Sequence, residues 1–437
     1  MLAKKKINYF PGIIAGILFS VTGSSQTLRL PDAISIALKN SLDIQVLKNN
    51  VQITETNNNI GVAGGLPVIN STISDNEQVT GVNQKLNTGV IIKRSGAVGN
   101  TLNTGLTASI LLYNGSRVIT TKKRLEELQA QSEEYLNAQI QDVVAAVMTA
   151  YYDIIRQESY LKTIDHSIDA SQKRLDIVKT QQNVGMANNA DLFQSQLDLN
   201  SLLQAKQSQQ LAIDQSKTAL LQLLTLKPDS LINITDTIIV DNSVTLGDIL
   251  NSLRNNADII AADKQIRISQ LISKETEAQR YPTLSASTSY SYNRSQISAG
   301  QLLLNQSNGF SGGLRLSIPI YNGSIYKRQK KVADINIKNA ALEKDILIRD
   351  YTANAVKTFQ AYSNGLQQIE TQQQNVVLAG KLLDLVLMRF QLRQATILEV
   401  KQAQQSFEDA SYTLTNLSFA AKSSEVELKR LANQIKF

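Results

Sequence analysis

Two long stretches of the chain place apolar side chains at helical spacing. Residues 117–183 contain neither Pro nor Gly, and their apolar positions recur at a spacing near 3.5, which is typical of packed coiled-coil helices. Residues 325–390 repeat this pattern, with Gly365 as a helix breaker within the stretch. At 1.5 Å per residue, each stretch predicts a helical rod of about 100 Å. Shorter helices are predicted after each rod, over residues 190–224 and 397–431.

Four shorter stretches alternate with a period of two. They lie near residues 66–75, 105–113, 283–292 and 311–320. Segments of about ten residues that are apolar on one face and small or polar on the other are typical of transmembrane β-strands. A soluble sheet is the alternative for any one of them alone. The polar stretches 76–103 and 293–309 are then expected to be outward loops. Aromatic residues at the strand ends fit an interfacial belt, namely Tyr113, Tyr290, Tyr292, Phe310 and Tyr321.

These elements form an internal repeat. The segment from Ile110 to Ser116 recurs from Ile318 to Ser324, at an offset of 208. Each copy has the order helix, strand, strand, very long helix, helix, and the first helix is expected to run from Pro31 to the Gly64-Gly65 pair. We place the first repeat at 26–224, a linker at 225–245 and the second repeat at 246–437. After each Tyr-Asn-Gly-Ser, the Asn and Ser are expected to cap the long helix.

The first 25 residues have the order of a secretory signal peptide. Lys4, Lys5 and Lys6 precede an apolar run over residues 10–21, and small residues follow as far as Ser25. The run is too short to span a bilayer, for which about 20 residues are needed. We therefore expect an exported protein that is cleaved near Ser25.

Composition excludes several classes of function. The chain has no Cys and a single His, so neither disulfides nor clustered thiolate or imidazole metal ligands are available. The net charge of +7 over 437 residues is too small to favour nucleic acid. No nucleophile-base arrangement and no phosphate loop is present in the sequence. We expect no enzyme activity and no cofactor.

Four strands cannot close a barrel, and open strand edges cannot exist in lipid because their backbone groups would lack partners. The barrel must then be shared between chains. Two chains give eight strands and three give twelve, and only the larger barrel leaves an aqueous lumen. The predicted fold class is mainly α with a transmembrane β-barrel portion, in which long helical hairpins form a periplasmic α-barrel. Together these parts predict a conduit.

The two hairpin turns carry the most specific motifs. Residues 184–192 (Val-Gly-Met-Ala-Asn-Asn-Ala-Asp-Leu) and 390–400 (Phe-Gln-Leu-Arg-Gln-Ala-Thr-Ile-Leu-Glu-Val) resemble the periplasmic tips of the outer-membrane efflux (TolC) family. The doubled unit resembles that family over nearly the whole mature chain. The resemblance implies a homotrimeric exit duct in the outer membrane that extends into the periplasm. It also implies docking on a periplasmic adaptor and an inner-membrane pump, in efflux or type I secretion. The residues expected at the docking tips are Val184, Gly185, Leu392 and Arg393.

The same motifs indicate a gate at the periplasmic mouth. Asp191 and Glu399 occupy equivalent places in the two copies, so a trimer would hold three of each around its axis and attract cations. Phe390 is expected to narrow this mouth, and the neutral Gln402 implies no further acidic ring. Arg393 replaces the usual Gly, and with Ala395 it implies the loss of an ion-pair lock. The alternative is that both acids stabilise the starts of their helices.

Two choices stay open at this point. A coiled-coil surface protein, whether structural or a receptor, would share the rods and the signal peptide, although it would not need amphipathic strands. Within the conduit class, nothing in the chain distinguishes drug efflux from protein secretion.

Overall fold

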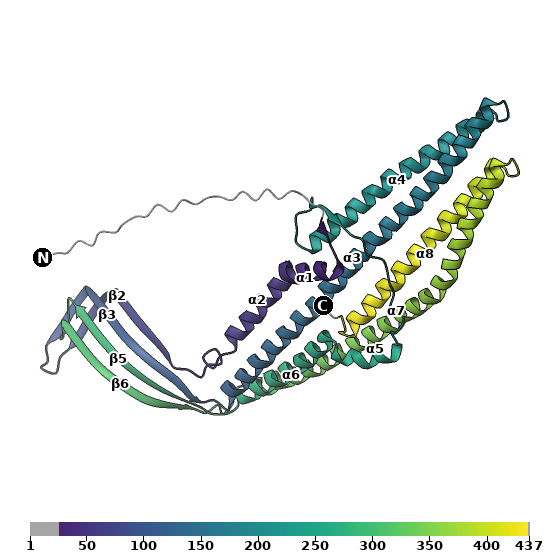
Figure 1. The fold of residues 1–437 in the computed structure, drawn as a ribbon. Helices are drawn as coiled ribbons and strands as arrows, with labels where there is room; N and C mark the ends of the chain where they lie inside the picture. The colour runs from purple at the N-terminus through teal and green to yellow at the C-terminus, as the bar shows by residue number, and fades with distance from the viewer. Residues whose placement is uncertain (1–25, 436–437) are drawn as a thin grey trace, which may run out of the picture.

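A computed structural model describes residues 26–435 of the chain. A curved four-stranded sheet occupies one end, and two long helical hairpins extend from it to the other end (Figure 1). The expected signal peptide lies outside the described residues. Among residues 26–435, no helix has both the length and the apolar composition needed to cross a membrane.

The order of helices and strands occurs twice along the chain. The first half contains β1 (Gln26–Thr27), α1 (Leu30–Asn40), α2 (Leu42–Asn57), β2 (Val68–Lys85), β3 (Ile91–Tyr113), α3 (Arg117–Asn183) and α4 (Asn189–Leu223). The second contains β4 (Ile232–Asn233), α5 (Leu246–Ser252), a short 3-10 turn (Leu253–Asn255), α6 (Ala257–Ala278), β5 (Thr283–Ile297), β6 (Leu304–Ser317), α7 (Ile325–Gln391) and α8 (Ile397–Leu431). The helix expected to run from Pro31 to Gly64 is in fact two helices, because Ser41 ends α1 and its hydroxyl accepts the Ile44 amide at the start of α2.

The strands are longer than the alternation predicted. The four antiparallel strands have the order β2-β3-β5-β6, and β2 pairs with β3 as far as Lys85 and Ile91. The expectation that 76–103 is a loop was therefore wrong over most of its length, as was the corresponding expectation for 293–309. Backbone pairing continues there without a hydrophobic pattern, because the ladder satisfies N–H and C=O groups whatever the side chains are. At the other end β6 stops at Ser317, two residues before Pro319, which has no N–H to donate.

The register separates the side chains of the sheet into two chemically different faces. Ser285, Ser287 and Ser289 share one face with their β6 partners Arg315, Gly313 and Ser311. The other face holds an apolar set, namely Leu284, Ala286, Tyr290, Phe310, Leu314 and Leu316. Most of this second face is exposed to the surroundings of the single chain. A sheet with one small polar face and one exposed apolar face suits a wall between water and lipid.

The helical half is held together around the middle of α3. Tyr151 on α3 is fully buried, and its hydroxyl donates to the Leu28 carbonyl at 2.9 Å and to the Asp236 carboxylate at 2.6 Å. Burial is the main cause that raises the pKa of Tyr151. Since Leu28 precedes α1 and Asp236 belongs to the linker, one side chain fixes both segments on the rod.

A buried carboxylate fixes the linker to the second hairpin. Glu425 on α8 accepts from Lys422 and Lys429 and from the backbone N–H of Asp241, which lies at 2.9 Å. Tyr362 on α7 donates its hydroxyl to the Asp241 carbonyl. Opposite charges and hydrogen bonds compensate the burial of Glu425, which explains how an acid can occupy this seam.

The two strand-to-helix junctions share one backbone conformation with different surroundings. Gly115 and Gly323 adopt φ of +68° and +66°, a left-handed conformation that favours glycine. The serines that follow do not cap their helices as expected, because Ser116 and Ser324 are also left-handed and make no side-chain cap. At the first junction the Asn114 side chain accepts from the Val118 N–H instead.

This pair of glycines gives a matched test of the packing at the junctions between the sheet and the helices. A Cβ on Gly115 would lie 2.8 Å from Tyr281 Cβ and 3.0 Å from the Ala278 carbonyl, whereas one on Gly323 would meet nothing within 4 Å. We predict that Gly323→Ala costs about 1 kcal/mol of backbone strain. Gly115→Ala should cost about 1–3 kcal/mol more, because α6 must shift. Thermal unfolding of the two variants in detergent measures the difference, and equal loss in both would contradict the contact.

Candidate functional site: the paired hairpin tips

The two hairpin turns, far from the sheet, have the same backbone geometry. Gly185 has φ of +72°, and the amides of Gly185 and Met186 bond back to Gln182 and Gln181. Arg393 takes the same left-handed conformation with φ of +62°, and the amides of Arg393 and Gln394 bond to Phe390 and Arg389. The geometry that favours Gly is thus kept in the second turn although Arg occupies it, at a strain of about 1–2 kcal/mol.

The tips present apolar surface to solvent. Val184 is 60% exposed and Leu392 63% exposed, and a Cβ on Gly185 would meet no atom within 4 Å beyond its own chain neighbours. The Arg393 guanidinium donates to the Met186 sulfur and so joins the second tip to the first. All four residues expected at the docking tips therefore lie at the two turns.

Asp191 and Glu399 both occupy the third position of a returning helix, but their carboxylates have different surroundings. Glu399 forms a capping box with Thr396, whose N–H donates to its carboxylate at 2.6 Å. This backbone hydrogen bond is the main cause that lowers the pKa of Glu399. In α4 the Asn188 side chain caps the Asp191 amide at 2.8 Å, and the Asp191 carboxylate has no hydrogen-bond partner among residues 26–435. The Glu399 carboxylate is therefore hydrogen-bonded at its own helix start, whereas the Asp191 carboxylate lies in a first turn without such a bond among the described residues.

Phe390 lies between the hairpins in the single chain. It is only 5% exposed and packs in one cluster with Val178 of α3 and Val400 of α8. A hollow beside it is bounded by Asp191, Thr396 and Lys401. Gln402 is exposed on α8. The structure thus brings Asp191 and Phe390 to one hollow, while Gln402 lies outside its lining.

An ion-pair network that sequence reasoning missed joins the hairpins behind the tips. Asp198 of α4 accepts from Arg174 of α3 at 2.8 Å and from Lys401 of α8 at 3.0 Å. The loss of an ion-pair lock, implied by Arg393 and Ala395 in the second turn, stays a prediction. The Asp198 network is a separate link between the hairpins. One signal could have shown it: Arg174 lies on the apolar stripe of α3, between Ser171 and Val178, where an unpaired charge is unfavourable. Its partners could not be found in the sequence, because they come from two other helices.

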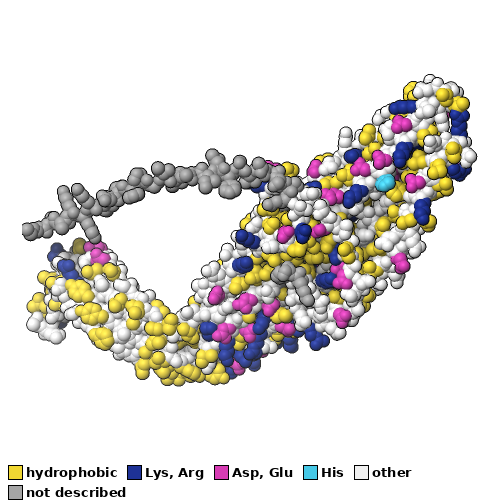
Figure 2. All heavy atoms as spheres, viewed as in Figure 1, with side chains coloured by type: hydrophobic (Ala, Val, Ile, Leu, Met, Phe, Trp, Pro, Cys, Tyr) yellow, Lys and Arg dark blue, Asp and Glu magenta, His cyan; other side chains and the backbone are white. Residues whose placement is uncertain are grey.

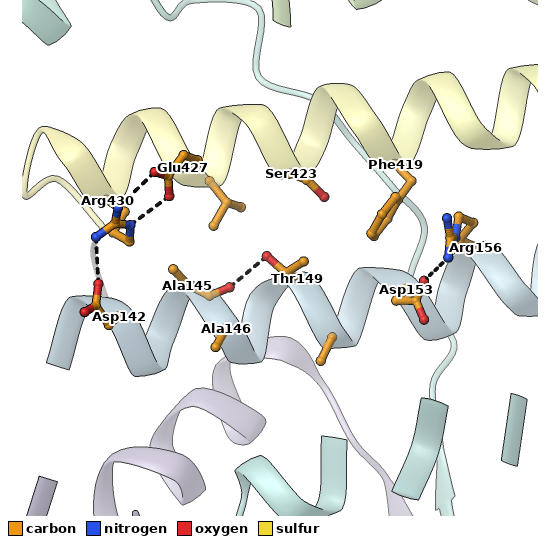
Figure 3. Close-up of a pocket in the computed structure, with 12 residues that line it drawn as sticks. Asp142, Ala145, Ala146, Thr149, Asp153, Arg156, Phe419, Ser423, Glu427 and Arg430 are labelled. Atoms are coloured by element: carbon orange, nitrogen blue, oxygen red, sulfur yellow. Dashed lines mark hydrogen bonds and ion pairs between the residues drawn. The ribbon is translucent and has the colours of Figure 1, made fainter. Parts of the chain in front are cut away.

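A second hollow lies between α3 and α8, nearer the linker (Figure 3). Its charged residues are already paired: Arg430 bonds to Asp142 at 2.7 Å and to Glu427, and Arg156 bonds to Asp153. Within residues 26–435 no group of three metal-ligating side chains occurs. These paired charges stabilise the two helices and the seam between them.

The Asp198 network makes a quantitative prediction. Arg174 is only 1% exposed, so Asp198→Asn leaves a buried guanidinium without its carboxylate and should cost about 3 kcal/mol. Lys401→Gln is the control, because the Lys401 side chain is 50% exposed and its pair should contribute less than about 1 kcal/mol. Chemical denaturation of the purified protein compares the two. An equal, small effect would show that Asp198 does not hold the hairpins together.

Comparison with known proteins agrees with this geometry. The sequence profile described as outer membrane efflux protein matches residues 33–226 and 249–434, one segment for each repeat. Outer membrane protein TolC of Vibrio cholerae serotype O1 is 23% identical over 342 residues, which cover 75% of this chain and 76% of that protein.

Solved structures show the same fold. The outer membrane protein VceC of Vibrio cholerae aligns with a TM-score of 0.75 at 18% identity, over 92% of this chain and 96% of that one. The MtrE outer membrane channel of Neisseria gonorrhoeae, in its open state, aligns with a TM-score of 0.74 at 16% identity, over 93% and 89% of the two chains. The doubled hairpin unit, the sheet with one apolar face and the profile match over both repeats show that the chain belongs to the outer membrane efflux protein family.

Proposed function

We propose that three copies of this chain form the exit duct of a tripartite efflux or type I secretion system. The observation that carries the proposal is the four-stranded sheet, in which β2 and β6 each have one unpaired edge within the described residues. In lipid these edges need partners, and three chains supply a closed barrel of twelve strands. The helical hairpins would extend its lumen about 100 Å into the periplasm. The duct itself is passive and opens on docking.

A coiled-coil surface or receptor protein is the alternative. It would account for the hairpins, since they need only a packed seam. It gives no reason for an apolar outer face on the sheet, on which Phe310, Leu314 and Leu316 are exposed. The membrane-spanning duct therefore has the better physical support.

We propose that the hairpin tips dock on the periplasmic adaptor. Exposed apolar residues at both turns, Val184 and Leu392, offer the contact surface, and Gly185 leaves open space beside them. A protein interface with a small apolar centre can form there.

The docking proposal predicts the effect of bulk at the tip. Gly185→Trp should abolish efflux in cells and adaptor cross-linking while the trimer still assembles. Gly89→Trp is the control, because Gly89 has φ of +84° and open space like Gly185 but lies in the turn between β2 and β3. Normal efflux by the Gly185→Trp protein would place the contact elsewhere.

We propose that Asp191 and Glu399 line the periplasmic mouth. Three copies of each would place six carboxylates in a constriction, which favours cations over anions. Asp191 carries more of the proposal, because the Glu399 carboxylate is already bonded to its own helix start. Phe390 contributes by packing the hairpins together, and Gln402 adds no charge.

Two measurements test the trimer and the mouth: native mass spectrometry gives the number of copies, and conductance in planar bilayers gives the ion selectivity. Native mass spectrometry of the purified channel should give three times the mass of the mature chain. Asp191→Asn with Glu399→Gln should lower the cation-to-anion permeability ratio several-fold, because six charges are removed at unchanged shape. Asp229→Asn with Glu343→Gln, two exposed acids of the linker and of α7, should leave the ratio unchanged. An unaltered ratio in the first variant would make both acids helix-stabilising residues only, and a monomeric mass would contradict the duct.

A further inference from the structure

Basic residues gather where the helices leave the sheet. Residues 114–124, 278–282 and 321–334 contain nine Lys or Arg and one acid, Asp334. Figure 2 shows dark-blue side chains concentrated there, beside the yellow side chains at the base of the sheet. No part of the duct mechanism described above requires this charge.

The cations divide into two groups by their contacts. Lys122, Arg124 and Lys330 are half-buried and form ion pairs with Glu126, Glu275 and Asp334. The other six are exposed and make no ion pair within residues 26–435; we call them the basic collar: Arg117, Lys123, Arg280, Lys327, Arg328 and Lys331. The first group stabilises helix packing through its ion pairs. The basic collar has no acidic partner within the described residues.

The collar borders the apolar band of the sheet. Exposed apolar and aromatic residues lie between the strands and the collar, and they include Ile320, which is 94% exposed, Tyr113, Tyr281 and Tyr321. From Phe310 to Ser317 strand β6 advances seven residues, and the chain runs on for three more to Ile320. Ten extended residues cover at most roughly 33 Å, which at a tilt of about 40° spans about 25 Å. This matches the apolar band of an outer-membrane barrel, so the collar lies at the periplasmic headgroup level.

The collar also opposes the electrostatics of the helices that carry it. The helices α1, α2, α4, α5, α6 and α8 each have an acid in the first turn. The helices α3 and α7 have none there, and they begin with Arg117 and with Lys327 and Arg328 instead. Cations at a helix N-terminus are unfavourable, so helix stability does not explain this placement. A negatively charged partner outside the chain would offset the unfavourable interaction of these cations with the helix N-termini.

We propose that the basic collar binds the phosphate headgroups of anionic phospholipids in the periplasmic leaflet. Lys and Arg side chains can lay their apolar stems along Ile320 and Tyr321 while their charged ends reach the headgroups. Basic segments next to a membrane attract anionic lipids over about one Debye length, which is about 10 Å at 0.1 M salt. The inference uses the membrane placement of the sheet and is independent of the proposed gate and docking tips.

The test measures lipid selectivity directly. The complete protein is reconstituted in phosphatidylcholine bilayers, and electron spin resonance compares spin-labelled phosphatidylglycerol with spin-labelled phosphatidylcholine at the protein surface. We expect the wild-type protein to favour phosphatidylglycerol at least about threefold in 0.1 M salt. The preference should fall toward one in 1 M salt, where the Debye length is about 3 Å.

Two variants distinguish binding by the basic collar from attraction by the overall positive charge of the protein. Replacing Arg117, Arg280, Lys327 and Arg328 by Gln should remove the preference. Replacing Lys162, Lys173, Lys357 and Lys381 by Gln removes as many exposed cations from the rods and should leave it intact. If the collar variant fails to assemble, the salt series on the wild-type protein decides. Equal association of both lipids with the wild-type protein, or a preference that survives in the collar variant or in 1 M salt, would overturn the proposal, whether or not the gate and docking predictions hold.

Discussion

The outer backbone edges of β2 and β6, which have no partner strand in the described part of the chain, are the constraint on which the rest of the molecule depends. In water an exposed edge can bond to solvent, but in lipid each unpaired N–H and C=O is strongly unfavourable. The apolar face of the sheet directs it into lipid, and the edges then require neighbouring copies. Oligomerisation is thus a consequence of backbone chemistry, and a lumen follows because a barrel of twelve strands is too wide to fill with side chains.

The internal repeat gives the molecule two equivalent hairpins with different chemistry. Gly185 and Arg393 adopt the same left-handed conformation at the two turns, and Gly115 and Gly323 do so at the two junctions. In each pair the backbone is the same while the contacts differ: Arg393 bonds to Met186, and Gly115 packs against Tyr281. Duplication therefore preserves the path of the chain, and side chains distinguish the copies where one hairpin meets another part of the molecule.

Charged side chains add directional contacts to the apolar packing of the long hairpins. Asp198 connects three helices near the tips, and Glu425 holds the linker against α8. Apolar packing alone is not directional, so these hydrogen-bonded ion pairs help to decide which helix faces meet. Exposed pairs such as Lys206 with Asp165 add little by comparison.

The sequence by itself determined the long helices and the order of the main elements, because each depends on local periodicity. The bounds of α3 and α8 agree with the helical stripe, since apolar spacing and the absence of Pro and Gly act over a few residues. The repeat also placed Asp191 and Glu399 at equivalent positions. Only the tertiary structure decided that β2 and β3 continue through polar residues, since strand pairing depends on a distant partner and not on hydropathy. It alone joined Arg174, Asp198 and Lys401. It also showed that the Glu399 carboxylate bonds to Thr396, while that of Asp191 has no hydrogen-bond partner among residues 26–435. These contacts depend on how separate helices pack and on side-chain orientation, which no local pattern in one chain records.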